Sequence, residues 1–255
     1  MTSKLIRFVV LNLSSVLLGT FLWAHPVRPA ACSNGSLTGR YGFAINGTAN
    51  GNPITAVGQI ATNGNGTLDG IETISDNGAV GNRLGVLGTY AIESNCTGTM
   101  TIQAAGRSKQ NFSVTVISGG NQIVMVQTDN GTTESGAAQA QVSKSCSLAG
   151  SKGTYGLQGE GTEIGVGPLA FAGQITLHGD GTLSGTQTAS VNGSIASKQK
   201  ISGVYKVAHN CQGAAVIEVN NQSPINLNLV VVNGGHGILF IRTDAKNLLS
   251  GSLQL

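Results

Sequence analysis

The side chains of this chain that could support acid–base or metal chemistry are few, and their closest groupings lie in its second half. The 255 residues include only 11 acids and four histidines. His178 lies two residues before Asp180, and an imidazole beside a carboxylate can act as a general base. Glu160 and Glu163 lie among glycines, where two carboxylates could bind a cation such as Ca²⁺.

Turn signals around these residues favour structural roles. Asp180 begins an Asp-Gly dipeptide, which is typical of hairpin turns, so His178 is expected on an exposed loop. Carboxylates in loops are usually solvated, and this is the state expected of Glu160 and Glu163. We therefore predict no catalytic, cofactor-binding or metal-binding residue, and we keep the general-base pair as the alternative.

An internal repeat organises the chain. Cys32 and Tyr41 match Cys146 and Tyr155 at an offset of 114, since 146 minus 32 and 155 minus 41 give the same number. Beyond these residues the offset is 115 and holds to the end of the chain. The matches include Gly58-Gln59-Ile60 with Gly173-Gln174-Ile175, Asn95-Cys96 with Asn210-Cys211, and Thr128-Asp129 with Thr243-Asp244.

The repeat predicts two domains, at residues 32–142 and 143–255, joined almost without a linker. The positions that both copies share are mainly Gly, Tyr, Cys, Asn and small apolar residues, whereas the titratable residues mostly differ. His178, His209 and His236, for example, correspond to Asn63, Ser94 and Asn121. This distribution favours a scaffold over a reaction carried out by both copies.

The four cysteines allow three disulfide connectivities. Only the pairs Cys32 with Cys96 and Cys146 with Cys211 make each repeat self-contained. Closing loops of this length would stabilise each domain by about 4 kcal/mol on the chain-entropy model. An exported chain enters an oxidising compartment, so these disulfides are expected to form.

The N-terminus predicts the route of export. Lys4 and Arg7 precede an apolar run at residues 8–23, and small residues follow up to position 31. This order is typical of a secretory signal peptide at residues 1–31, and it predicts a mature chain without a transmembrane span, in the periplasm or outside the cell. In the alternative, Cys32 is lipidated and anchors the protein to a membrane.

Each copy has the apolar period of a β-strand, with turn dipeptides such as Asn-Gly every 8 to 15 residues. About eight strands per copy would close an up-and-down antiparallel barrel, and a β-sandwich is the alternative. In the first copy the expected strands are 41–45, 56–62, 67–74, 84–92, 97–103, 112–117, 123–128 and 134–141. The fold class is therefore all-β, with two tandem barrels.

All four tyrosines follow a Gly-x dipeptide, which predicts a bend covered by the ring, with the hydroxyl bonded to the backbone. Each copy orders its motifs as Gly-x-Tyr-Gly, a Gly-x-Ile strand with an Asn/Asp-Gly-Thr-Leu turn, Gly-x-Tyr before Asn-Cys-x-Gly, Thr-Asp and Ser-Gly. This order resembles the secreted bacterial domains known as allene oxide cyclase barrel-like, over nearly all of 32–255. The resemblance implies a small calycin-like barrel. Plant allene oxide cyclases rearrange a fatty-acid epoxide inside such a barrel, but no position here matches their catalytic residues, so that activity is not implied.

Charge and apolar patterning restrict the partners. A net charge of +3 without a basic cluster beyond Lys198-Gln199-Lys200 argues against binding of nucleic acid.

Residues 123–126 and 238–241 are apolar on both strand faces, which predicts that the two copies pack on each other, or on a second chain, through these segments.

The expected function is that of an exported, non-enzymatic protein that binds a small apolar ligand or acts as a structural or interaction module of the cell envelope. The alternative is an isomerase or cyclase that acts on a lipid-like substrate in a barrel lumen.

Overall fold

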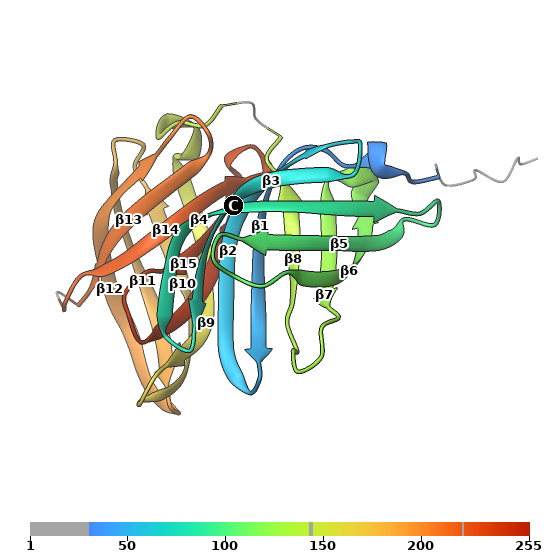
Figure 1. Cartoon of the computed structure of the whole chain (residues 1–255). Coiled ribbons are helices and arrows are strands. Elements are labelled where there is room, and N and C mark those ends of the chain that lie inside the picture. Colours follow the sequence, from blue (N-terminus) through green and yellow to red (C-terminus); the bar gives the residue numbers. More distant parts are fainter. Residues whose placement is uncertain (1–30, 143–144, 221) are drawn as a thin grey trace, which may run out of the picture. The chain divides into compact units, whose positions relative to one another are not determined.

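Two closed antiparallel barrels of eight strands each follow one another in the computed structural model, which describes residues 31–142, 145–220 and 222–255 (Figure 1). The first barrel consists of β1 (Thr38–Ala49), β2 (Asn52–Asn63), β3 (Thr67–Asp76), β4 (Ala79–Ile92), β5 (Thr97–Ala104), β6 (Gln110–Ile117), β7 (Gln122–Gln127) and β8 (Ser135–Ala140). The second consists of β9 (Gly153–Glu163), β10 (Gly167–Leu177), β11 (Thr182–Val191), β12 (Ser194–Val207), β13 (Gln212–Val219), β14 (Ile225–Val232), β15 (Gly237–Arg242) and β16 (Asn247–Gln254). The predicted fold class is confirmed, and the sandwich alternative is wrong.

Short 3-10 turns are the helical elements of the described residues: η1 (Asn34–Ser36), η2 (Ser118–Gly120), η3 (Ala149–Ser151) and η4 (Asn233–Gly235). No helix in these ranges has the length and hydropathy of a membrane span. The predicted signal segment, residues 1–31, lies outside the described residues apart from Ala31.

Each barrel is closed by its first strand, which pairs on both sides. Tyr41 of β1 lies opposite Ile60 of β2 and also opposite Ala140 of β8. The strand β9 pairs in the same way with β10 and with β16. Closure satisfies the backbone N–H and C=O groups around the whole ladder and leaves no edge strand for another chain to pair with.

The first hairpin of each copy explains why the repeat offset changes from 114 to 115. Asn50 and Gly51 connect β1 to β2, whereas residues 164–166 connect β9 to β10. Both Asn50 and Gly51 have positive φ, at 51° and 79°, as a two-residue hairpin loop requires. The second copy therefore has one more loop residue, and the strands on either side keep their register.

The disulfides and the tyrosines lie at one end of each barrel. The disulfides are Cys32–Cys96 and Cys146–Cys211, which are the pairs predicted from the repeat. The tyrosine hydroxyls bond to the backbone, also as predicted. Tyr41 donates to the Gly120 carbonyl and Tyr155 donates to the Gly235 carbonyl, both at 2.7 Å. Tyr90 donates to the Leu37 carbonyl at 2.9 Å, and Tyr205 accepts a hydrogen bond from the Gly179 N–H at 3.1 Å. These contacts fix the chain where each barrel begins.

Alternation along the strands places every second side chain in a lumen. The core of the first barrel includes Phe43 of β1, Ile60 of β2 and Phe112 of β6. The core of the second includes Leu157 of β9 and Phe240 of β15. Each barrel thus has a hydrophobic core of its own.

A third apolar cluster joins the two barrels, which belong to one compact unit from Ala31 to Leu255. In this cluster Val57 of β2 packs with Leu239 and Ile241 of β15. The prediction that the apolar strand segments are covered is therefore confirmed for the second copy. In the first copy, Val124 and Val126 of β7 are 39% and 48% exposed in the single chain, and their packing on a second chain stays a prediction. The first barrel contributes β2 to the contact, so β7 does not take part.

Polar side chains surround this contact, and their hydrogen bonds cross between the barrels. Gln59 Nε2 donates to the Asn210 carbonyl at 2.7 Å, and Gln212 Nε2 donates to Gln59 Oε1 at 2.9 Å. Arg83 Nη2 donates to the Gly213 carbonyl at 2.8 Å. Because buried polar groups need partners, these bonds let the interface exclude water without leaving the amides unpaired.

Gly42 allows the barrels to approach closely, which gives a matched pair of variants. A Cβ at Gly42 would lie 2.4 Å from Val232 Cγ1 and 2.7 Å from Val230 Cγ1, whereas at the equivalent Gly156 the nearest atom, Gln254 O, is 3.7 Å away. We expect Gly42→Ala to lower the free energy of unfolding by about 1–3 kcal/mol through overpacking. Gly156→Ala should be neutral or slightly stabilising. Urea denaturation measures both, and equal effects of the two variants would contradict the interface.

Candidate functional site

The lumen of the second barrel contains a cavity of about 200 Å³. Side chains from all eight strands line it, and most of them are apolar, including Leu157, Phe171, Ala189, Ala215 and Phe240. The rings of Phe171 and Phe240 stack with their centroids 6.3 Å apart. This is an interior in which an apolar molecule would be separated from water.

Small residues create this cavity, because the first barrel has larger ones at the same positions. At four equivalent positions the first barrel has the larger residue: Phe43 against Leu157, Ile74 against Ala189, Met100 against Ala215, and Phe112 against Leu227. These four side chains of the first barrel are each at most 1% exposed. The second copy compensates only in part, with Phe171 and Phe240 where the first has Ala56 and Met125.

Polar side chains line the cavity toward the end where β15 finishes, opposite the disulfide. They include Glu163, Gln187, Gln199 and Arg242. Gln187 Nε2 donates to Gln199 Oε1 at 3.2 Å. Arg242 Nε donates to Asp244 Oδ2 at 2.8 Å, which fixes the guanidinium at this end. The cavity therefore has an apolar body and one polar end.

The first barrel has a different inner layer at the corresponding end. Glu72 of β3, Gln127 of β7 and Glu134, just before β8, are 2%, 9% and 2% exposed. In each of them Oε1 has no hydrogen-bond partner among the described residues. The sequence interpretation did not single out these residues, although Glu72 shares the inward strand position of Leu68 and Ile74.

Burial changes the acidity of both glutamates. It raises the pKa of Glu72 from 4.5 to about 7, against an opposing effect of the Arg107 guanidinium. Burial likewise raises the pKa of Glu134 to about 7; Arg107 opposes this increase, while the carboxylates of Asp76, Glu72 and Asp129 add to it. Arg107 itself pairs with Asp76 at 2.8 Å. The layer thus holds two carboxyl groups that titrate near neutrality.

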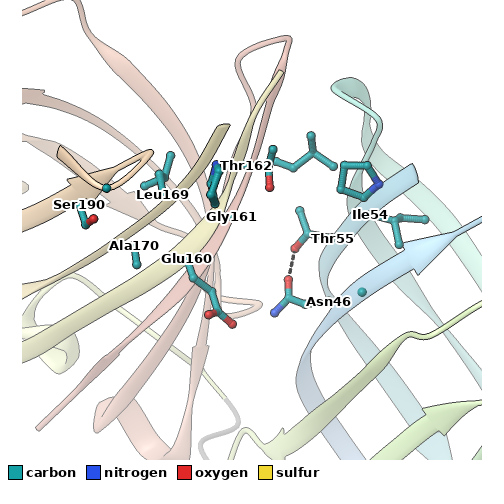
Figure 2. A pocket seen from close by; sticks show the side chains of 14 residues that line it. Asn46, Ile54, Thr55, Glu160, Gly161, Thr162, Leu169, Ala170 and Ser190 are labelled. Carbon is teal, nitrogen blue, oxygen red and sulfur yellow. Dashed lines mark hydrogen bonds between the residues drawn. The ribbon is translucent and has the colours of Figure 1, made fainter. Parts of the chain in front are cut away.

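The acids singled out in the second copy are not brought together. Glu160 and Glu163 are three residues apart in β9, so they point to opposite faces of the strand. Glu163 lines the lumen, and Glu160 lines an open groove of about 390 Å³ between β1–β2 and β9–β11 (Figure 2). The cation-site alternative for this pair is therefore wrong.

The groove in Figure 2 lies between strands of the two barrels, and one of its amide oxygens is engaged within the chain. Asn46 Oδ1 accepts a hydrogen bond from Thr55 Oγ1, drawn as a dashed line, and a second from Ser250 Oγ at 2.7 Å. Small and apolar residues such as Ala170 and Leu169 form much of the remaining wall. The groove is therefore a seam between the two barrels, and the lumens are the stronger candidates for binding.

His178, His209 and His236 occupy exposed loops, as predicted. His178 Nε2 lies 3.0 Å from Ser184 Oγ. The Asp180 carboxylate instead accepts from the N–H and Oγ1 of Thr182, at 2.8 and 2.7 Å, and these hydrogen bonds hold its pKa below the usual range. Asp180 therefore caps its own turn. The ranges that the structure describes hold no group of three or more His, Cys, Asp or Glu side chains placed to bind a metal.

Comparisons with known proteins assign no family. No family model matches the chain, and no curated protein matches it. One solved structure with a detectable likeness is described as "Crystal structure of CghA with Sch210972". It is 9% identical, with a TM-score of 0.24 over 86% of this chain and 89% of that chain, which is too weak a likeness to bear on fold or ligand.

The raised pKa values predict how stability depends on pH. Between about 4.5 and 7 the folded chain holds protons on Glu72 and Glu134 that the unfolded chain has released, so the free energy of unfolding should fall as pH rises through this window. The loss is at most about 3 kcal/mol per group. Glu72→Gln with Glu134→Leu introduces the residues of the second copy, Gln187 and Leu249. This double variant should be more stable at neutral pH and show a flatter profile in urea denaturation. An unchanged slope would contradict the assignment.

Proposed function

We propose that the protein is an exported binder of a small apolar molecule, which it holds in the lumen of the second barrel. The observation that carries the proposal is the apolar cavity of about 200 Å³. At about 24 cal/mol per Å³, an empty cavity of this size costs the folded state about 5 kcal/mol. The first copy fills the same positions with larger side chains, so the fold does not require a cavity. Its presence in the second copy favours an occupant.

The cavity restricts the ligand in size and polarity. Its volume is that of roughly seven water molecules in the liquid. The apolar walls suit a short hydrocarbon chain or a small ring. At the polar end, Arg242 and Gln199 can donate hydrogen bonds to a single oxygen of the ligand. A medium-chain alcohol or carboxylic acid has this combination of properties.

Export and family are part of the proposal. The two disulfides are consistent with an exported protein, and we propose the periplasm or the extracellular space as its compartment. The two eight-stranded barrels and the bonded tyrosine hydroxyls support membership of the allene oxide cyclase barrel-like group.

An isomerase or cyclase, the alternative function, would need the same cavity. The appearance of a new product during incubation with a ligand would distinguish such an enzyme from a binder.

Filling the cavity tests the proposal. Ala189→Ile with Ala215→Met introduces the residues of the first copy, Ile74 and Met100. We expect this double variant to gain about 2 kcal/mol in the free energy of unfolding, because apolar atoms replace empty space. It should also lose the binding of 1-octanol and octanoate, measured by calorimetry and by the shift in thermal midpoint.

Ala172→Ile is the matched control, because Ala172 lies on the exposed face of β10. It should bind both probes as the unchanged chain does. If the cavity-filling variant retains full affinity, or if neither probe binds the unchanged chain, the ligand does not occupy this lumen.

A further inference from the structure

The mouth of the first barrel opposite its disulfide is hollowed into a cup of about 450 Å³. Gln127 and Glu134 line it, and both are at least nine-tenths buried. Each has an Oε1 atom without a hydrogen-bond partner among the described residues, and so does Glu72 in the same lumen. Two buried acceptor oxygens of the cup's wall, and a third in the same lumen, are thus left without a donor, which is costly unless something binds there.

The orientation of Gln127 makes its free oxygen an acceptor for a ligand. Its Nε2 donates to Asp129 Oδ2 at 2.9 Å. Asp129 is itself held in place, because it accepts from the Asn111 N–H and from Asn111 Nδ2, both at 2.7 Å. With the amide nitrogen engaged, Gln127 Oε1 remains the acceptor end of the side chain.

The second copy shows that the barrel does not need this acidic layer. With the offset of 115, Glu72, Gln127 and Glu134 correspond to Gln187, Arg242 and Leu249. The same fold therefore closes around a neutral, a basic and an apolar side chain. Because unpaired buried carboxylates destabilise a core, their presence in the first copy favours a binding role over a structural one.

The charges around the cup favour a cation. Four carboxyl groups face the layer or its rim, from Glu72, Asp76, Asp129 and Glu134, and two cations do, from Arg107 and Lys109. Arg107 is engaged by Asp76 at 2.8 Å, and Lys109 is exposed at the rim. The ionised site therefore has a surplus of negative charge, and the acceptors within it are buried.

We infer that this cup binds the ammonium group of a small organic cation, with Gln127 and Glu134 of its wall accepting N–H donors and the Glu72 carboxyl group adding negative charge from the same lumen. A primary ammonium offers three N–H donors, so it can bond to both free acceptors of the cup at once. Ala49 and Ile54 line the same cup and provide an apolar wall for an alkyl chain. A metal ion suits the site less well, because the described residues hold no group of three His, Cys, Asp or Glu side chains placed to bind one.

Titration of the full chain with n-butylammonium chloride tests the site. At mildly alkaline pH and constant ionic strength, calorimetry should show saturable binding. Tetramethylammonium, which has no N–H donor, should bind at least about tenfold more weakly, and 1-butanol should not bind. Glu72→Gln with Glu134→Leu should weaken butylammonium binding at least about tenfold. Both substitutions exist in the second barrel, and circular dichroism verifies that the variant folds.

The pH dependence gives a second measurement. As pH falls below about 7, Glu72 and Glu134 take up protons while the ammonium stays charged, so the affinity for butylammonium should fall. The cavity-filling variant Ala189→Ile with Ala215→Met should bind butylammonium normally, so this site and the apolar cavity are tested separately.

Three results would overturn the inference. The first is the absence of saturable butylammonium binding to the unchanged chain. The second is equal affinity for tetramethylammonium, or full retention of binding by the double variant. The third is calcium chloride binding more tightly than butylammonium and losing that binding in the double variant, because the cup would then be a metal site.

Discussion

Closure of the β-ladder is the constraint on which the rest of the structure depends. Because β1 pairs with β2 and β8, and β9 with β10 and β16, every strand has two neighbours and each side chain must face either a lumen or the outside. A barrel of eight strands has an interior just wide enough for side chains or for one small ligand. Whether a lumen is filled or hollow therefore depends on the volumes of the inward residues alone. Ala189 and Ala215 in place of Ile74 and Met100, with Leu157 and Leu227 in place of Phe43 and Phe112, leave space.

The contact between the barrels breaks the symmetry of the duplication. The outer face of β15 is covered, with Ile241 fully buried, whereas the equivalent Val126 of β7 is half exposed. The covering strand is β2, where Val57 is apolar, and Gly42 on the neighbouring β1 leaves room for Val232. One copy therefore uses the outer faces of β1 and β2, and the other uses those of β14, β15 and β16. Two copies with the same fold thus came under different constraints at equivalent positions.

Features set by local chemistry could be predicted from the sequence. The hairpin turns and the bonded tyrosines depend on residue types at short, fixed spacings, and the disulfide pairs follow from the repeat, which the sequence shows directly. The acidic layer was missed because Glu72 and Glu134 are 62 positions apart in the sequence and meet only when the barrel closes. Strand alternation was the available signal, since Glu72 follows Leu68 on the inward face. The cavity depends on side-chain volumes summed over eight strands, which no local pattern contains.

The two lumens differ in chemical character at the same end. Both ends opposite the disulfides have polar inner residues, but the first copy has Glu72 and Gln127 where the second has Gln187 and Arg242. A lumen with two carboxyl groups that are unpaired among the described residues and one that combines the Arg242 guanidinium with the Glu163 carboxylate will not select the same ligand. Because the strand register and the disulfides are common to both copies, these inner positions could change without loss of the fold. The duplication therefore provides one scaffold with two separately adjustable interiors, in which differences between the copies are a better guide to binding than the positions they share.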